Sequence, residues 1–280
     1  MIKIITDSTS DISREEAEKL GVTVVPLRVL FGDTAYMDGV DLGPDEFYER
    51  LSKARELPTT SQPSPEDFVP IFRAVAEKSD SAVVILISGK LSGTTQSAAI
   101  AREIVGYEDI HVIDSDTTIV GMRLLIDQAL KMRGSGISAG MIAENIRDMV
   151  PRVVLFAMVD TLEYLYKGGR LSRAAKIAGT LLGFKPIITL KDGEIKLLGR
   201  ARGVKNALSA MLGYMDESPA AQPGVPFYFG YTAIREKCDT FRELAGKKYD
   251  TSLFSVCPVG CTIGTHVGPG ACIVAYLAKK

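Results

Sequence analysis

Hydrophobic and polar positions along the first half of the chain form short apolar runs separated by amphipathic stretches, which predicts alternating strands and helices. The apolar runs, rich in β-branched residues, predict strands at 2–6, 22–31, 34–37, 81–87 and 110–113. The amphipathic stretches predict helices at 14–20, from Pro44, from Pro65, and at 93–105, 117–132 and 139–149. Ser13 and Glu16 have the spacing of a helix capping box. This alternation favours a mostly parallel sheet with helices on both faces.

The pattern changes after Pro151. Asp192-Gly193 predicts a tight turn joining two strands into a β-hairpin. The strands expected here are 153–159, 186–190, 194–198, 227–231, 251–256 and 271–276, with helices at 204–215 and 234–245. We therefore expect an α/β protein with two domains, an N-terminal parallel-sheet α/β/α domain at 1–150 and a C-terminal α+β domain at 151–280.

Composition excludes several functional classes. The 280 residues carry 33 basic and 34 acidic side chains, a net charge of −1. The chain therefore lacks the excess of positive charge that is typical of nucleic-acid-binding proteins. Hydrophobic residues make up 46% of the chain and mean hydropathy is +0.13, which argues against disorder. No apolar stretch approaches the roughly 20 residues of a membrane span. The N-terminus has no targeting signal, and we expect a cytoplasmic protein.

The four cysteines do not predict a metal site. Cys238, Cys257, Cys261 and Cys272 lie near the C-terminal end, and the spacing of four between Cys257 and Cys261 is unusual for zinc. Buried free thiols are the favoured interpretation, in keeping with a reducing compartment.

Three segments rich in serine, threonine and glycine follow strands or precede helices, at 59–64, 88–97 and 264–270. The second directly follows a buried strand, where open α/β sheets bind their ligands. Hydroxyls and backbone N–H groups at a helix start also suit an anion. The alternative for each segment is a structural role in caps and turns.

Common catalytic motifs are absent from the sequence. There is no P-loop for nucleotide phosphates, and Ser92 does not stand in the Gly-x-Ser-x-Gly pattern of a hydrolase. Of the two histidines, His111 falls within a predicted strand and is expected to be packed. His266 lies between glycines in what we predict to be a loop, and is the better functional candidate.

Arginines beside glycines supply a further signal. Arg170, Arg173 and Arg202 stand at predicted junctions between elements. They serve either surface solubility or a phosphate clamp, because guanidinium groups bind phosphate oxygens in a bidentate way. Since the chain has no nucleotide motif of its own, such a phosphate would be brought by a partner.

Several segments together resemble the DegV family. They are Ile4-Ile5-Thr6-Asp7-Ser8-Thr9, Thr60-Ser61-Gln62-Pro63-Ser64, Leu91-Ser92-Gly93-Thr94, Leu162-Glu163-Tyr164-Leu165, Gly168-Gly169-Arg170 and Gly264-Thr265-His266 with Gly268-Pro269-Gly270. The match runs in order from residue 2 to about residue 276, and the combination is much more specific than any one segment.

The resemblance implies a bacterial protein that buries a long-chain fatty acid between two domains and uses no other cofactor. It implies that Thr60 and Ser92 hold the carboxylate, with Ser61, Gly93, Thr94 and His266 close by. It further implies that the carboxylate is presented to a separate ATP-binding fatty acid kinase subunit, which makes an acyl phosphate for phospholipid synthesis. Arg170, Arg173 and Arg202 match the basic, partner-facing region. The chain would then be a carrier and not an enzyme.

Two other functions stay open from the sequence. One is a lipid-responsive regulatory protein with no kinase partner. The other is an acyl hydrolase that uses Ser92 as nucleophile and His266 as base.

Overall fold

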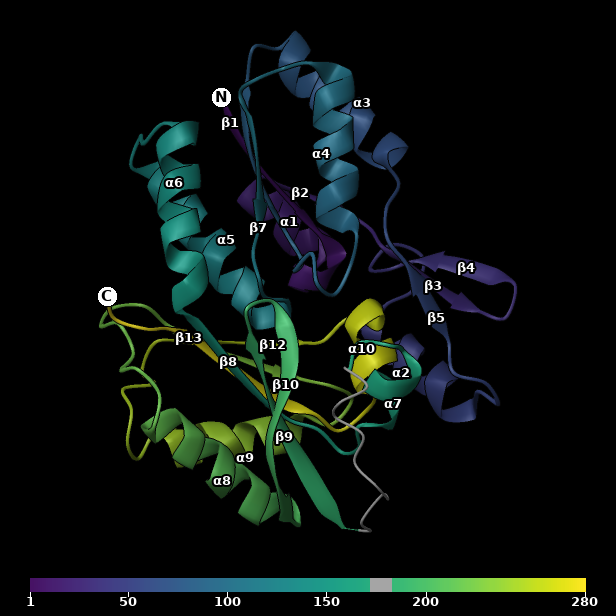
Figure 1. The fold of residues 1–280 in the computed structure, drawn as a ribbon, viewed down its shortest axis with the longest axis vertical. Coiled ribbons are helices and arrows are strands. Elements are labelled where there is room, and N and C mark those ends of the chain that lie inside the picture. Colours follow the sequence, from purple (N-terminus) through teal and green to yellow (C-terminus); the bar gives the residue numbers. More distant parts are fainter. Residues whose placement is uncertain (172–182) are drawn as a thin grey trace.

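The computed structural model describes residues 1–171 and 183–280, and Figure 1 shows two main sheets with a long helix between them. The N-terminal sheet is parallel throughout, in the order β2-β1-β6-β7. Its strands are β1 Ile2–Asp7, β2 Val22–Val25, β6 Ser81–Leu86 and β7 Ile110–Asp114. The central strands β1 and β6 are mainly apolar on both sides, because each face of the sheet contacts its own helical layer.

Helices cover both faces of this sheet, which confirms the predicted α/β class (Figure 1). The helices are α1 Arg14–Leu20, α3 Pro65–Glu77, α4 Thr94–Val105, α5 Ile119–Gly134 and α6 Ala139–Met149. Ile5 and Val84 pack on one face with Phe68 and Phe72 of α3. Neighbouring residues such as Ile4 point to the opposite face and pack against α5 and α6. The alternation of side chains along a strand produces this division.

A small antiparallel sheet, β4-β3-β5, lies beside the parallel one. Its strands are β3 Arg28–Phe31, β4 Thr34–Met37 and β5 Thr59–Ser61, and α2 Pro44–Lys53 packs against it. The single strand expected at 22–31 is therefore wrong: β2 and β3 belong to different sheets. Pro26 stands between them, and a proline has no N–H to continue a ladder.

The C-terminal sheet has the order β10-β9-β8-β13-β11-β12 and is mixed. Its strands are β8 Val153–Met158, β9 Phe184–Lys191, β10 Glu194–Arg202, β11 Phe227–Tyr231, β12 Phe254–Pro258 and β13 Cys272–Leu277. The helices in this part are α7 Glu163–Lys167, α8 Val204–Asp216, α9 Arg235–Ala245 and α10 Cys261–Val267. β9 and β10 form the predicted hairpin, and α8 and α9 cover one face of the sheet (Figure 1).

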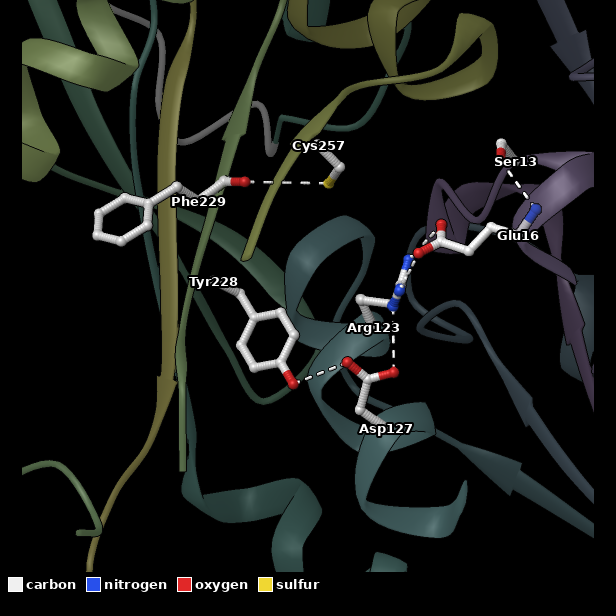
Figure 2. A network of polar contacts seen from close by, with 7 residues as sticks. All are labelled: Ser13, Glu16, Arg123, Asp127, Tyr228, Phe229 and Cys257. Atoms are coloured by element: carbon white, nitrogen blue, oxygen red, sulfur yellow. Dashed lines mark hydrogen bonds and ion pairs between the residues drawn. The ribbon is translucent and has the colours of Figure 1, made fainter. Parts of the chain in front are cut away.

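Helix α5 joins the two main sheets into one core, since its apolar residues pack against both. Figure 2 shows the polar side of this contact: the Arg123 guanidinium on α5 donates to the Glu16 carboxylate on α1 and to Asp127. The hydroxyl of Tyr228 on β11 donates to Asp127 Oδ2 at 2.9 Å. Ser13 caps α1 as predicted, but the Glu16 side chain turns to Arg123 instead of closing the box.

All residues of the parallel sheet precede Val150, and all those of the six-stranded sheet follow it. The division into domains at residue 150 stays a prediction, because α5 shares its core with both sheets. We call the two sides the N-terminal lobe (residues 1–150) and the C-terminal lobe (the described residues of 151–280). None of the helices in the described part of the chain is long and apolar enough to cross a membrane.

Candidate functional site

A cavity of about 250 Å³ lies between the two lobes. A single water needs only about 10–15 Å³ of such space, so the cavity admits a much larger ligand. Most of its wall is apolar and includes Ile119, Leu155, Ile188, Leu190, Ile195 and Ile273. Polar side chains also line it: Thr60, Ser61, Gln62, Ser92, Arg170 and His266. An apolar wall with a few polar groups is suited to an amphipathic ligand.

Strand β5 aims Thr60 into the molecule. Side chains alternate along a strand, and in β5 Thr60 is half-buried while Thr59 and Ser61 are exposed. Thr60 pairs with Val29 of β3 in the antiparallel ladder. Its Oγ1 lies 2.8 Å from Nε2 of His266, which belongs to the other lobe.

Ser92 reaches the cavity from the loop that joins β6 to α4. Its Oγ lies 2.9 Å from Thr94 Oγ1. The Gly93 N–H donates to Gln62 Oε1 at 2.9 Å, and a Cβ on Gly93 would lie 2.3 Å from that oxygen. A larger residue at position 93 would therefore displace the Gln62 amide from this contact. Gly93 and Thr94 stand behind Ser92 and do not themselves line the cavity.

His266 lies on helix α10, and the predicted loop is wrong. The helix was missed because its glycines resemble turn signals. Gly264 instead permits close packing, since a Cβ there would lie 2.7 Å from Phe47 Cε1 and from the Tyr48 hydroxyl. Gly268, with φ of +74°, ends the helix.

The His266 imidazole is buried and electrically neutral near pH 7. Burial, aided by the positive charge of Arg170, lowers the pKa of His266 to about 4. Nε2 faces Thr60, while Nδ1 has no hydrogen-bond partner among the described residues. Nδ1 instead lies against the backbone of Gly168, where a Cβ would come within 2.2 Å.

Arg170, expected on a partner-facing surface, lines the cavity. Its Nε donates to the Leu91 carbonyl at 3.2 Å and its Nη1 to the Gly168 carbonyl at 2.6 Å. Burial lowers the pKa of this guanidinium, but arginine starts so high that it keeps its charge. Arg202 is exposed at the end of β10 and does not line the cavity, and Arg173 lies outside the described residues.

Gln62 lines the cavity without being singled out by the sequence pattern, as do Thr118, Thr189 and Thr262. The Gln62 amide joins its own loop to the start of α4, because Oε1 accepts from the N–H of the cap residue Gly93 and Nε2 donates to Ser97 Oγ at 3.2 Å. The one indication of this role in the sequence is that Gln62 follows Ser61 in the polar segment 59–64.

The remaining candidates lie elsewhere. His111 is half-buried in β7, 3.0 Å from Asp109 Oδ1, as a packed strand residue. The four cysteines are free, with Cys257 half-buried and the other three buried. Within residues 1–171 and 183–280, no group of three or more histidine, cysteine or acidic side chains has the arrangement of a metal site.

The arrangement does not provide a serine nucleophile with a histidine base. The Ser92 hydroxyl is hydrogen-bonded to Thr94, and His266 Nε2 is engaged with Thr60. An activated serine needs its base within hydrogen-bonding distance. The polar groups are instead suited to binding an anionic headgroup.

Comparison with known proteins gives matches over the whole length. A family model described as uncharacterised proteins of the DegV family matches residues 1–279. A DegV domain-containing protein from Caldanaerobacter subterraneus is 36% identical over 278 residues, covering 99% of each chain. A fatty-acid-binding DegV family protein from Thermus thermophilus has a TM-score of 0.91 at 33% identity, covering 99% of each chain. A stearic-acid-binding protein from Eubacterium ventriosum has a TM-score of 0.89 at 33% identity, covering 100% of this chain and 99% of the other.

Proposed function

The chain belongs to the DegV family, and on that premise we propose that it binds a long-chain fatty acid in the cavity between its lobes and presents the carboxylate to a separate ATP-dependent fatty acid kinase subunit. Solved relatives at 33% identity are described as fatty-acid-binding, one of them with stearic acid. The role is one of binding and presentation, with the fatty acid as the only ligand.

The single observation that carries the proposal is the amphipathic wall of the cavity. Thr60 and Ser92 supply hydroxyls, and Arg170 supplies a cation. A buried carboxylate is costly without such partners. The rest of the wall is mostly aliphatic, and each methylene removed from water contributes about 0.8 kcal/mol. A chain of about 16 carbons therefore contributes roughly 10 kcal/mol before the entropic costs of binding.

A neutral His266 suits presentation of the carboxylate as a nucleophile. The pKa of His266 is about 4 in the ligand-free protein, and even a rise toward the ordinary value of 6.5 on ligand binding leaves the ring mostly neutral near pH 7, so it forms no second full ion pair with the ligand. Arg170 is tied to two backbone carbonyls, so part of its hydrogen-bonding capacity is already used. The carboxylate is thereby stabilised while keeping its reactivity toward a phosphoryl donor. Arg173 and Arg202 are proposed to contact the kinase or its phosphates.

The sequence contains no P-loop, which supports a separate protein as the source of ATP. We place the protein in the bacterial cytoplasm, where ATP and a lipid-synthesis partner are available. The alternative is a lipid-responsive regulator that has no kinase partner. Phosphoryl transfer from ATP to bound oleate, in the presence of a purified ATP-binding subunit, separates the two.

The fatty-acid ligand is tested by extracting the purified protein with organic solvent and analysing the extract by mass spectrometry. We expect a fatty acid at close to one equivalent per chain. A protein that is free of lipid and also rejects added oleate would refute fatty-acid binding. Hydrolysis of an acyl ester by the purified chain alone would instead support the Ser92–His266 hydrolase.

A further inference from the structure

Helix α10, which carries His266, belongs to the C-terminal lobe but is held at its start by an acidic residue of the N-terminal lobe. Asp38 directly follows β4 and is only 4% exposed. Its Oδ1 accepts the Cys261 N–H at 3.0 Å, and its Oδ2 accepts the Thr262 N–H at 3.1 Å. Both carboxylate oxygens thus satisfy N–H groups of the first turn of α10, which the cap residue Gly260 cannot do with a side chain.

Asp38 is itself fixed in place by the N-terminal lobe. The Ser8 hydroxyl donates to Asp38 Oδ2 at 3.1 Å. The backbone N–H of Asp38 donates to the Leu27 carbonyl at 2.9 Å, and that of Leu27 donates to Ser8 Oγ at 3.0 Å. The carboxylate therefore has little freedom to follow α10 if the helix moves.

Other contacts seat the same helix against the same lobe. The Tyr48 hydroxyl on α2 donates to the Val259 carbonyl at 3.0 Å, just before α10. The Cys261 thiol donates to the Leu42 carbonyl at 3.2 Å. Gly264 lies against the rings of Phe47 and Tyr48, and Figure 1 shows α10 beside α2. The start and one side of α10 are thus held against the N-terminal lobe, which also carries Thr60.

We propose that Asp38 is a positioning residue for the ligand headgroup: by holding the first turn of α10 to the N-terminal lobe, it sets where His266 stands relative to Thr60 and Ser92. His266 is five residues beyond Cys261 on a rigid helix, so a shift of the first turn is carried to the imidazole. The inference rests on the proposed fatty-acid function, because the headgroup that His266 meets is the carboxylate.

The test is Asp38→Asn, which keeps the size of the side chain but replaces one acceptor oxygen by a donor facing an N–H. Affinities are measured for oleate and for oleyl alcohol, which share the same tail. We expect the preference for oleate to fall about tenfold, while the alcohol is bound much as before. A defect in the apolar part of the cavity or in folding would lower the affinities for oleate and oleyl alcohol together and leave the preference for oleate unchanged. That result would overturn the proposal.

Asp41→Asn is the matched control. Asp41 is exposed, three residues away, and its Oδ2 accepts the Met37 N–H within its own loop. This variant should keep the wild-type preference. If Asp38→Asn does not fold, Gly264→Ala displaces α10 from Phe47 and the Tyr48 hydroxyl while leaving Asp38 itself intact, and the same loss of oleate preference is expected.

A double-mutant cycle shows whether Asp38 acts through the imidazole. In a His266→Gln background, Asp38→Asn should change the oleate preference no further, whereas fully additive effects would overturn the positioning role. If wild-type protein binds neither ligand, the proposed function fails.

The inference is then decided separately by NMR, since the His266 ring signals of the ligand-free protein should shift in Asp38→Asn and stay in place in Asp41→Asn.

Discussion

His266 Nε2 lies 2.8 Å from Thr60 Oγ1, although 206 residues separate the two in sequence. The contact joins the C-terminal helix α10 to the short strand β5 of the N-terminal lobe, at the polar side chains of the cavity. Two lobes must therefore meet before the headgroup site exists. A ligand bound there contacts both, so its binding should stabilise the folded protein in which the two lobes meet.

Removing the hydroxyls should weaken binding of fatty acids. Thr60→Ala and Ser92→Ala each delete a proposed donor to the carboxylate, and a hydrogen bond to a charged group contributes about 1.5–3 kcal/mol. We expect each variant to lose roughly tenfold to a hundredfold in oleate affinity. Titration calorimetry measures the affinity, and native mass spectrometry shows whether lipid is retained. Thr59→Ala, an exposed neighbour on β5, is the control. Full lipid retention by both variants would reject this headgroup assignment.

Much of the fold was predictable because its strands are continuous apolar runs. β1 and β6 are recognisable without knowledge of their partners, since both faces of each are covered by helices. α10 was not predictable in the same way. Gly264 is needed for contact with Phe47, which is distant in sequence, so its meaning appears only once the lobes are assembled.

The sequence predicted the hydroxyl groups of the candidate site, but it did not predict that the Arg170 guanidinium lines the cavity. Ser92 follows a buried strand, a position that local pattern identifies. The inward position of Arg170 depends instead on the carbonyl of Leu91, in a loop of the other lobe. A sequence shows the arginine and its glycine neighbours, but it does not show which backbone acceptor the side chain will meet.

A methyl group at Gly168 should disturb the site through His266. The Cβ of an alanine there would lie 2.2 Å from Nδ1, so the imidazole must shift from its present position against Thr60. The φ of −75° at Gly168 is open to alanine, although the new Cβ would also lie 3.0 Å from the Tyr164 carbonyl oxygen. We expect Gly168→Ala to reduce oleate affinity to about the level of His266→Gln, measured by titration calorimetry.

Gly213→Ala provides the matched comparison, because its Cβ would meet no atom within 4 Å on helix α8. Alanine in a helix interior should stabilise by up to about 1 kcal/mol and leave the affinity unchanged. Wild-type affinity in Gly168→Ala would mean that the imidazole position does not matter for binding.

Among the ion pairs of the described residues, those of Arg123 on α5 should contribute most to the free energy of unfolding. Arg123 is 7% exposed and pairs with Glu16 and Asp127. Arg123→Met leaves Asp127 with only the hydroxyl of Tyr228 (Figure 2). Breaking a buried pair costs about 3–5 kcal/mol, and we expect about 2–3 here because Glu16 is partly exposed. Tm should then fall by roughly 4–12 °C in thermal denaturation.

An exposed ion pair on α1, Arg14 with Glu18, is the control for the Arg123 substitution. Arg14 and Glu18 are both largely in solvent, with the Nε–Oε1 distance at 3.4 Å. Arg14→Met should change Tm by no more than about 1–2 °C, because exposed pairs contribute little. Equal effects of the two substitutions would contradict a special role for the α5 contact.

His266 should make stability depend on pH in the ligand-free protein. Burial, with the charge of Arg170, lowers its pKa from 6.5 to about 4, so protonation favours the unfolded chain. The contribution of the neutral ring is fully present above pH 6.5 and is lost as pH falls toward 4. The contribution of His266 to the free energy of unfolding is at most about 3 kcal/mol. Asp7, whose pKa is raised to about 6 chiefly by burial, acts in the opposite direction over the same range.

The comparison of wild type with His266→Gln isolates the histidine, because Asp7 is present in both proteins. Urea denaturation from pH 7.5 to 4.5 should show the wild-type advantage shrinking as pH falls. Parallel curves for the two proteins would contradict a buried neutral imidazole. Bound oleate should raise the pKa of His266 toward 6.5, because the ligand carboxylate favours the imidazolium form. An NMR titration of the ring signals, with and without oleate, measures that shift directly.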